Sequence, residues 1–539
     1  MKLRIGLDFD NTLACYDEVF AIVAKEQKLI PNEWRGSKKE LRDFLRILEG
    51  GELLWQKIQG KVYGKYMNQA TLFPGVAEFL WKCKLNQVEV FIVSHKTEYG
   101  HFDEEKINLR TAALQWMKQK GFFDSNEFNI SIENVFFSTT RLEKIRKINE
   151  LELSYFIDDL IEVFEEKEFS SLTKKILFGK LEADIGSIKN IIEFDSWRKI
   201  SLSIFSEFSL EEIFSVLTQK WKDLNLTGIK TIKANGNSRV YRVDSNEQSY
   251  VLKIYPDLQL DPRKRLETEY QSCLVLYQFN LAVPKPIRMD DVLNWGLYLW
   301  IEGKDTDERQ SNLIFQLIEF IQKLKEIKNK VPEETFRYAS EACLSGAELE
   351  LQIQKRFIIL QNLDNFELNQ FLIYELQPTL NFFLERAKSF YKEDFFVKLE
   401  KQYWILSPSD FGFHNSKLGL NGILYIYDLE YFGWDDPVKL ISDFFWHPGM
   451  NLTESERMVW LKKSIKIFDQ ENSGIEKRFL MYFPLYGIRW CLILLNEFLK
   501  TKLENRINAI PEKKDKLIDI QNIQLNKSKV LLNRIKQIA

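Results

Sequence analysis

The chain has 539 residues, which is enough for roughly two to four domains that each bury a core of their own. Hydrophobic residues make up 45% and charged residues 28%, as in an ordinary globular protein. Because 75 Lys and Arg stand against 78 Asp and Glu, the net charge is -3, which argues against a broad basic surface, and we expect no nucleic-acid partner.

The location of the protein is suggested by several weak signals. The five cysteines stand far apart and form no CxxC pair, so neither a zinc site nor a disulfide framework is indicated. The N-terminus turns acidic at once, unlike a signal peptide. The apolar stretch Phe479–Leu499 is interrupted by Pro484, Arg489 and Asn496, which favours a buried core helix over a membrane span. We therefore expect a cytoplasmic protein with no membrane partner.

The first part of the chain alternates short β-rich runs with helical stretches. The runs are Leu3–Phe9, Val88–Val93, Asn134–Phe137, Leu153–Ile157 and Lys175–Phe178. This alternation is typical of a parallel α/β sheet. An insertion at about 16–71 reads as helical. The sequence thus predicts a Rossmann-like parallel sheet with a small helical cap over residues 1–200.

A different pattern follows the amphipathic stretch Leu210–Trp221. It contains strand-like runs and one early helix, at 229–233, 240–243, 250–255, 261–277 (the helix) and 297–301. A mostly helical region at about 312–403, a strand cluster near 404–428 and further helices complete it. We predict a second, α+β domain over residues 205–539, with the boundary near 200–210.

Reactive side chains stand where the predicted strands of the first domain end. Asp8, Asp10 and Thr12 follow the first run, Ser94 the second and Asp158-Asp159 the fourth. Open α/β sheets bind ligands at that edge. One carboxylate can attack phosphorus, a second can move the proton, and Mg²⁺ prefers carboxylate oxygens. Ser94 and Lys144, which lies in the helical stretch before the fourth strand, would hold phosphate oxygens.

Four features resemble, in chain order, the four motifs of the haloacid dehalogenase-like (HAD) superfamily: the run DFDNTL, the run FIVSH, Lys144 and the run YFIDDL. The resemblance covers about the first 195 residues. The resemblance implies a phosphatase with Asp8 as nucleophile and Asp10 as acid and base. Thr12, Ser94 and Lys144 would bind phosphate, and Asp8, Asp10, Asp158 and Asp159 would surround the metal. Asn11 stands where the family more often has Gly.

The second domain carries the run LSPSDFGFHN, which ends at Asn415, and the run ILYIYD, which ends at Asp428. Asn421-Gly422 between them is a strong hairpin signal, so we expect Asn415 and Asp428 to lie side by side and to share Mg²⁺, with Asp410 facing them. Further upstream are residues suited to ATP phosphates, namely Asn237, Ser238 and Lys253, with Glu269 as a partner for Lys253.

These residues resemble the aminoglycoside phosphotransferase/choline kinase-like family over about 225–500. The resemblance implies a protein-kinase-like, two-lobed fold with Asp410 as catalytic base, Asn415 and Asp428 as metal ligands, and Lys253 with Glu269 positioning ATP. Pro408 stands where the family usually has His, two residues before the catalytic Asp.

Together the two halves predict a bifunctional enzyme. It would combine a Mg²⁺-dependent phosphatase that works through an aspartyl-phosphate with an ATP-dependent kinase of a small hydroxylated metabolite, such as a sugar or amino alcohol. The alternative is a single activity in which one domain, more readily the kinase half, is regulatory or only binds ligand. A nucleic-acid end-processing enzyme would normally carry a GxxxxGK[ST] loop, and a protein kinase a His-Arg-Asp loop; neither is found in the sequence. Oligomeric state, the substrates and ATP versus GTP stay open.

Overall fold

The structure, a computed structural model, describes residues 2–100, 105–179, 190–232, 238–259, 261–306, 312–469, 474–499 and 517–538. The chain divides into two compact units. Unit 1 is Met1–Arg263 with Asp290–Trp295, and unit 2 is Lys264–Met289 with Gly296–Ala539. The division into 1–200 and 205–539 stays a prediction.

Unit 1 is built around a six-stranded sheet of order β5-β4-β1-β6-β7-β8. Its strands are β1 (Arg4–Leu7), β4 (Glu89–His95), β5 (Val135–Ser138), β6 (Tyr155–Asp158), β7 (Lys174–Phe178) and β8 (Ile191–Phe194). All five neighbouring pairs are parallel. The predicted parallel α/β sheet is therefore confirmed, with β8 as an additional edge strand that the sequence did not predict.

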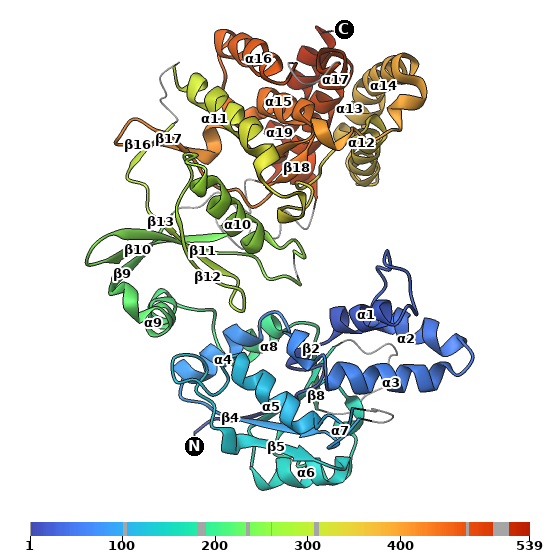
Figure 1. Ribbon diagram of the computed structural model, residues 1–539, viewed down its shortest axis with the longest axis vertical. Helices are drawn as coiled ribbons and strands as arrows, with labels where there is room; N and C mark the ends of the chain where they lie inside the picture. Colours follow the sequence, from blue (N-terminus) through green and yellow to red (C-terminus); the bar gives the residue numbers. More distant parts are fainter. Residues whose placement is uncertain are drawn as a thin grey trace. The chain divides into compact units, whose positions relative to one another are not determined.

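Helices cover this sheet on both sides. They are α4 (Val76–Leu85), α5 (Leu109–Gln119), α6 (Arg141–Glu150), α7 (Ile161–Phe164) and α8 (Trp197–Ile204). In Figure 1, α5 and α6 lie on opposite sides of strands β4 and β5. The layer under α6 buries Phe91 and Val93 of β4 against Ile145 and Ile148 of the helix. Both faces of the sheet are thus apolar, as parallel strands require.

The insertion at about 16–71 is helical, as predicted. It contains α1 (Asp17–Glu26), α2 (Lys38–Ile47) and α3 (Gly51–Tyr63). It begins and ends in a small antiparallel ribbon of β2 (Ala14–Cys15) and β3 (Thr71–Leu72). Within it, the rings of Phe20 and Trp55 stack with centroids 4.8 Å apart. Because β2 starts directly after Leu13, the ribbon joins the two ends of the insertion at the end of the Asp8–Leu13 segment.

The rest of unit 1 contains α9 (Leu210–Lys220) and the antiparallel strands β9 (Leu226–Thr231), β10 (Arg239–Ser245) and β11 (Ser249–Ile254). The helix is tied to α4 by the ion pair of Lys82 Nζ and Glu212 Oε2, 2.6 Å long. Two strands, β12 (Pro286–Asp290) and β13 (Trp295–Leu299), have residues in both units. The strand predicted at 297–301 starts two residues earlier, and β12 was not predicted.

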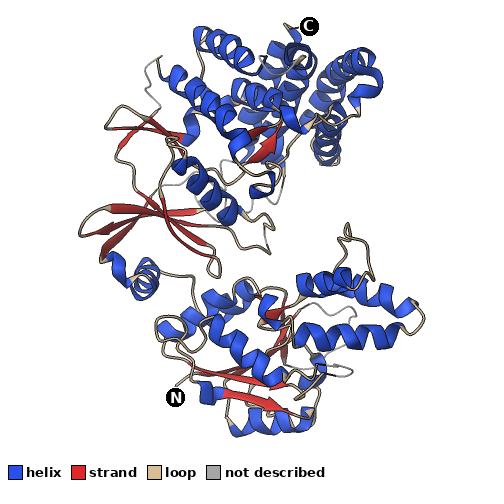
Figure 2. Cartoon of the chain, viewed as in Figure 1, coloured by secondary structure: helices blue, strands red, loops and turns tan. Residues whose placement is uncertain are grey.

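Unit 2 is mostly helical (Figure 2). Its helices are α10 (Arg265–Gln278), α11 (Leu313–Ile327), α12 (Gly346–Gln361), α13 (Phe366–Phe371), α14 (Gln377–Tyr391), α15 (Pro437–Trp446), α16 (Glu454–Asp469), α17 (Ile475–Leu494) and α19 (Leu517–Lys536). The short strands are β14 (Gly303–Asp305), β15 (Ile405–Ser407), β16 (Ser416–Gly419), β17 (Leu424–Ile426) and β18 (Gly433–Asp435). One large core contains buried residues of all these helices and of β15, β17 and β18.

Helix α17 carries the apolar stretch that the sequence analysis singled out. Among the described residues, Ile475–Phe498 is the one segment long and apolar enough to cross a bilayer, and 67% of its most apolar window is buried inside the protein. Arg489 within it is buried and bound to Asp443, with Nη2 2.7 Å from Oδ2. These contacts are those of a core helix.

Candidate functional site

The predicted residues of the first domain meet at one edge of the sheet. Leu7 of β1 pairs with Ile92 of β4 on one side and with Ile157 of β6 on the other. The next residue, Asp8, donates its backbone N–H to the carbonyl of Ile157 over 2.9 Å. Since all three strands run in parallel, Asp8 directly after β1, Ser94 near the end of β4 and Asp158 at the end of β6 lie at the same edge. All three side chains are buried.

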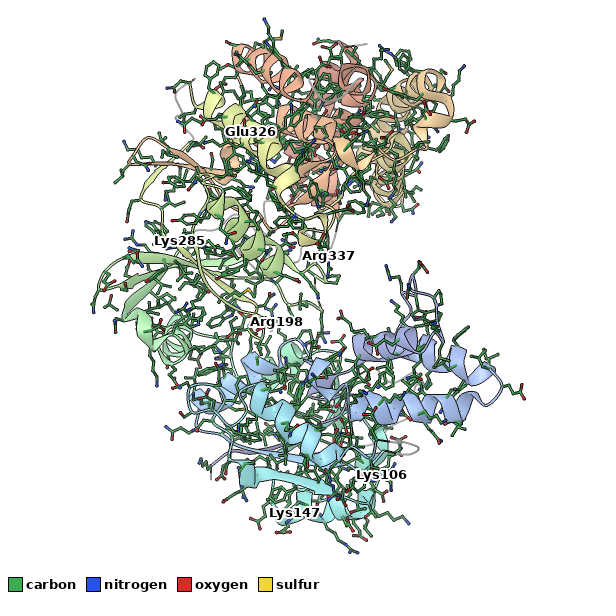
Figure 3. The ribbon with its side chains drawn as sticks, in the orientation of Figure 1. Lys106, Lys147, Arg198, Lys285, Glu326 and Arg337 are labelled. Carbon is green, nitrogen blue, oxygen red and sulfur yellow. The ribbon has the colours of Figure 1, made fainter. Side chains whose placement is uncertain are left out.

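Lys144 binds two of these carboxylates at once. Its Nζ lies 2.6 Å from Asp8 Oδ1 and 2.6 Å from Asp158 Oδ2. The lysine stands in the first turn of α6, where Thr140 and Glu143 form a capping box. Lys147, one turn further along α6, lies at the surface of unit 1 and pairs with Glu150 (Figure 3). The helix therefore presents one lysine to the site and another to solvent.

Asp10 is held by residues that the sequence analysis missed. Lys96 Nζ lies 2.9 Å from Asp10 Oδ1 and 2.8 Å from Oδ2, and the Tyr16 hydroxyl donates to Oδ1. Lys96 stands two residues after Ser94, so the alternation of a strand could have indicated that both point to one face. Tyr16 begins the helical insertion and carried no comparable signal.

The loop between Asp10 and Leu13 is fixed from three directions. Asn11 has a positive φ of 58°, which asparagine tolerates better than most residues, and this explains why it can replace the usual glycine. Lys38 of α2 donates to Asn11 Oδ1 over 2.6 Å. Thr12 Oγ1 donates to Asp159 Oδ1 over 3.2 Å, and the indole N–H of Trp197 donates to the Thr12 carbonyl over 2.9 Å.

The cluster of Asp8, Asp158 and Asp159 fits a divalent cation. Each offers a carboxylate oxygen, and these oxygens all lie within 4.8 Å of one another. Burial raises the pKa of Asp158, which Lys144 opposes, and burial together with the Asp8 and Asp158 charges raises the pKa of Asp159. One lysine does not balance this crowded negative charge. A hard cation with oxygen ligands would do so.

The second group of predicted residues surrounds the loop after β15. Asn415 Nδ2 donates to the Asp410 carbonyl over 2.9 Å. The following hairpin of β16 and β17 has the predicted turn, with Gly422 at a φ of 75°. It returns the chain so that Tyr427 N–H donates to the Asn415 carbonyl over 3.0 Å. Tyr427 therefore lies opposite Asn415 across the hairpin, and Asp428 is the next residue along the chain.

Two histidines approach Asp410. His414 Nε2 lies 2.9 Å and His447 Nε2 3.7 Å from Asp410 Oδ1, and the two rings stack with centroids 4.0 Å apart. Burial would raise the pKa of Asp410, but the hydrogen bond and charge of His414 outweigh it and lower the pKa to about 2. His447, far from Asp410 in sequence, was not predicted to take part.

Asp428 lies in an acidic group with Glu269 and Glu430, whose carboxylate oxygens are within 4.8 Å of one another. Arg265 forms a buried ion pair with Glu430 and donates to the Tyr431 hydroxyl over 2.9 Å. Oxygen ligands of this kind fit Mg²⁺. Glu269 was predicted as a partner of Lys253, whereas Glu430 was not predicted at all.

The remaining residues predicted for nucleotide binding lie in unit 1. Lys253 is on β11, with its Nζ 4.9 Å from the centre of the Tyr255 ring, and Ser238 stands buried just before β10. Asn237 lies outside the described residues. The pairing of Lys253 with Glu269 stays a prediction.

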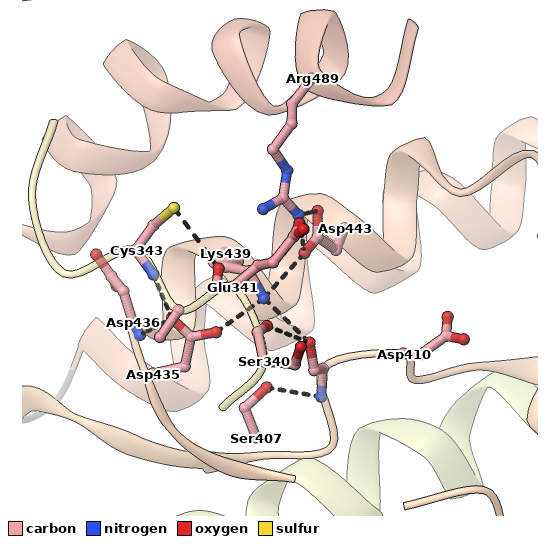
Figure 4. A network of polar contacts seen from close by, with 12 residues as sticks. Ser340, Glu341, Cys343, Ser407, Asp410, Asp435, Asp436, Lys439, Asp443 and Arg489 are labelled. Carbon is pink, nitrogen blue, oxygen red and sulfur yellow. Dashed lines mark hydrogen bonds and ion pairs between the residues drawn. The ribbon is translucent and has the colours of Figure 1, made fainter. Parts of the chain in front are cut away.

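A buried polar network lies beneath the Asp410 loop (Figure 4). Lys439 Nζ is 2.8 Å from Asp435 Oδ2 and 3.3 Å from Asp443 Oδ2. It also donates to the hydroxyl of Ser409 over 3.3 Å. The network connects the start of α15 to the residue that precedes Asp410.

Comparison with known proteins supports both resemblances. The phosphotransferase enzyme family matches residues 228–380 of the chain. In the N-terminal region, the 2-hydroxy-3-keto-5-methylthiopentenyl-1-phosphate phosphatase of Brevibacillus brevis is 31% identical over 98 residues, which is 17% of this chain and 43% of that protein. The chain thus spans less than half of the length of this curated relative. Residues 228–380 are thus similar to phosphotransferases, and a stretch of 98 residues in the N-terminal region is similar to a phosphatase.

Solved structures with a similar chain course include a spectinomycin phosphotransferase in complex with ADP and spectinomycin (TM-score 0.43, 12% identity, covering 61% of this chain and 99% of that one). A choline kinase from Streptococcus pneumoniae has a TM-score of 0.39 and 14% identity, covering 60% of this chain and 99% of that one. For a Plasmodium vivax ethanolamine kinase the TM-score is 0.42 and the identity 14%, covering 63% and 96%. Likenesses this distant do not bear on the substrate.

Proposed function

We propose that the chain is a bifunctional enzyme, with a Mg²⁺-dependent phosphatase in the first half and an ATP-dependent kinase of a small hydroxylated metabolite in the second. The observation that carries the proposal is the buried lysine Lys144, whose Nζ lies 2.6 Å from both Asp8 and Asp158. A lysine between two carboxylates at the ligand-binding edge of a parallel sheet is suited to a phosphate group.

In the phosphatase, a carboxylate oxygen of Asp8 attacks phosphorus, and the bond from phosphorus to the ester oxygen breaks. Asp10 gives its proton to the departing oxygen and so yields an alcohol. Asp10 then takes a proton from water, whose oxygen attacks the aspartyl-phosphate to release inorganic phosphate and restore Asp8. Ser94, Thr12 and Lys144 bind phosphate oxygens during both steps.

The cation proposed for this site would be held by Asp8, Asp10, Asp158 and Asp159. When bound, Mg²⁺ neutralises phosphate oxygens and so allows one anion to approach another. Lys96 and Tyr16 hold the Asp10 carboxylate in one orientation beside Asp8, because they contact its oxygens directly. This leaves Asp10 placed for the proton transfers.

In the kinase, Asp410 accepts a hydrogen bond from the acceptor hydroxyl and takes its proton as the oxygen attacks the terminal phosphorus of ATP. The bond from that phosphorus to the bridging oxygen breaks, and ADP leaves. Asn415 and Asp428 would hold Mg²⁺ on the nucleotide phosphates, with Lys253 and Glu269 positioning ATP. A pKa lowered to about 2 keeps Asp410 ionised, so that it can accept this hydrogen bond at neutral pH. The match of residues 228–380 to a phosphotransferase family supports phosphoryl transfer.

The phosphatase half is tested with p-nitrophenyl phosphate and Mg²⁺. We expect Asp8→Asn to lower kcat at least about 10³-fold, since the nucleophile is lost. Chelation of the metal should abolish turnover, and added Mg²⁺ should restore it. Asp43→Asn is the matched control, because Asp43 is an exposed carboxylate of α2 that pairs with its neighbour Arg42. An equal loss of kcat in Asp8→Asn and Asp43→Asn would contradict the role of Asp8 as the nucleophile.

The kinase half is tested with labelled ATP and a panel of sugars and amino alcohols. We expect transfer to at least one acceptor and a loss of about 10²- to 10⁴-fold with Asp410→Asn. Asp364→Asn, at an exposed position before α13, is the control. If nucleotide binds but no acceptor is phosphorylated, the chain has a single activity and its second half is regulatory or only binds ligand.

The proposed location of the enzyme is the cytoplasm.

A further inference from the structure

The turn before Asp410 has an unusual backbone. Asp410 N–H donates to the carbonyl of Pro408 over 2.8 Å, which closes a turn on the single residue Ser409. Ser409 has a φ of 64°. A turn of this kind with a positive φ is rare and strained for a residue with a side chain, and it persists only where the surroundings hold it.

Ser409 is held by contacts from three segments. Its N–H donates to Ser407 Oγ over 3.1 Å, and its hydroxyl donates to the Ser340 carbonyl over 3.2 Å. The third contact comes from Lys439, whose Nζ donates to the same hydroxyl over 3.3 Å. In Figure 4 the Asp410 side chain points away from these residues. The Ser409 side chain thus points to the buried network, whereas the Asp410 side chain points away from it.

The position of the Lys439 ammonium is itself fixed. Its side chain is 1% exposed and pairs with Asp435 and Asp443. Burial lowers the pKa of Lys439, but the two carboxylates outweigh it, so the pKa is raised and the ammonium stays charged. Asp443 is in turn held by Arg489 and by the indole N–H of Trp490 over 2.9 Å. Helices α15 and α17 therefore anchor the ammonium that reaches the turn.

We propose that Lys439 and Ser409 act together as positioning residues for Asp410. The ammonium fixes the Ser409 hydroxyl, the hydroxyl holds the strained turn, and the turn directs the Asp410 carboxylate toward the acceptor. This inference rests on the proposed kinase function. Displacement of a catalytic group by about 1 Å can cost about 10²-fold in rate, so support of this kind matters for kcat.

The two carboxylates depend on Lys439 to different degrees, because the ammonium is the ion-pair partner of Asp435 Oδ2 whereas Asp443 also pairs with Arg489. Asp435 Oδ1 also accepts the backbone N–H groups of Cys343 over 3.0 Å and of Asp436 over 2.9 Å. Asp443 keeps Arg489 and Trp490. A Lys439→Met variant, which keeps the length of the side chain, retains donors to Asp443 and to Asp435 Oδ1 but removes the cation beside Asp435 Oδ2, so a loss of stability is expected with it. Its contact with Ser409 is the one that connects the network to the reacting loop.

The test is a double-mutant cycle in the full chain with Ser409→Ala and Lys439→Met. The readouts are kcat and KM for ATP with the acceptor found in the panel, and hydrogen exchange of the backbone amides in 405–415. The matched control is Lys325→Met, a buried lysine of α11 whose Nζ donates to the Ile467 carbonyl over 2.6 Å. Ser409→Ala alone decides the outcome should Lys439→Met fail to fold.

We expect each variant to lower kcat about 10- to 100-fold with KM for ATP within about twofold, and to speed amide exchange in 405–415. The kcat of the double variant should lie no more than about twofold below that of the slower single variant. The effects of Lys325→Met and Ser409→Ala on kcat, expressed as free energies, should instead add when the two are combined. If kcat and exchange of both variants match those of Lys325→Met, the proposal is overturned. If the wild type transfers no phosphate while exchange still responds in both variants, the kinase function fails and the positioning role stands.

Discussion

Lys96 touches both carboxylate oxygens of Asp10, at 2.9 and 2.8 Å, from the residue next to the end of β4. A cation that grips both oxygens fixes the rotation of the carboxylate as well as its place. The Asp10 side chain is thus oriented by the sheet core through Lys96 and by the helical insertion through Tyr16. At the scale of single residues, the proton transfers that we propose for Asp10 depend on this orientation.

We therefore expect Lys96→Met to lower kcat for phosphate ester hydrolysis about 10- to 100-fold with a smaller change in KM, because Asp10 would lose its orientation. Steady-state kinetics with p-nitrophenyl phosphate measure this. Lys147→Met, at the surface of α6, should leave both constants unchanged. A Lys96→Met enzyme with wild-type kcat would show that the ion pair has no part in the reaction.

His447 makes stability depend on pH. Burial, with the nearby His414 charge, lowers its pKa from 6.5 to about 4, so the folded state keeps the ring neutral where the unfolded state takes up a proton. The unfolded state then binds more protons between about pH 6.5 and about pH 4, and the stability from this group is lost as the pH falls through that range.

His447→Phe keeps an aromatic ring beside Trp490 and removes the titrating group. We expect the wild type to lose urea stability faster than the variant as the pH falls from about 6.5 to about 4, measured by tryptophan fluorescence. Above about pH 7 the difference between the two midpoints should be constant. Parallel curves across the whole range would contradict the lowered pKa.

The first turn of α6 carries Lys144, so the cap of this helix belongs to the site. Thr140 Oγ1 accepts the N–H of Glu143 over 3.2 Å, and Glu143 Oε2 accepts the N–H of Thr140 over 3.2 Å. Ser209 and Glu212 form the same capping box on α9. The two caps thus differ in what their helix carries and not in their chemistry.

Thr140→Ala and Ser209→Ala should each cost about 1 kcal/mol of stability, since each removes an N-cap oxygen. Only Thr140→Ala should also lower the phosphatase kcat, by about 10-fold, because fraying of α6 displaces Lys144. Thermal unfolding and kinetics on the two variants separate the effects. Equal kcat values in both variants would mean that the cap does not help to position Lys144.

The elements that the sequence predicts best are those whose burial is complete. Strands β1, β4 and β6 lie inside the sheet, so the central residues of each are buried and apolar, and the reactive residues near their ends fall at one edge. Strand β8 lies at the edge and is largely exposed, and β12 mixes exposed with buried residues, so neither gave a clear pattern. The Asn421-Gly422 hairpin was predictable from its turn chemistry alone.

Partners that are distant in sequence could not be predicted. Lys38 reaches Asn11 from α2, and His447 reaches Asp410 from the end of α15, and in both cases only the packing of helices sets the approach. Lys439 likewise has no distinguishing signal in the sequence, and only the fold places it between two acids. The sequence motifs therefore predict the candidate site residues, whereas the residues that contact and orient them depend on tertiary packing.

For the molecule as a whole, two opposed phosphate chemistries in one chain have a consequence. A kinase and a phosphatase that acted on one and the same hydroxyl would only hydrolyse ATP. We therefore expect the two proposed activities to act at different positions of one metabolite or on successive intermediates. Each site has its own acidic cluster, with Asp8, Asp158 and Asp159 in unit 1 and Glu269, Asp428 and Glu430 in unit 2.

The most direct test of two independent phosphate sites is to measure both activities on the same preparations of wild type, Asp8→Asn and Asp410→Asn. The account predicts that Asp8→Asn abolishes phosphate ester hydrolysis and keeps transfer from ATP, and that Asp410→Asn does the reverse. Loss of both activities in either variant, with the fold intact by circular dichroism, would contradict it.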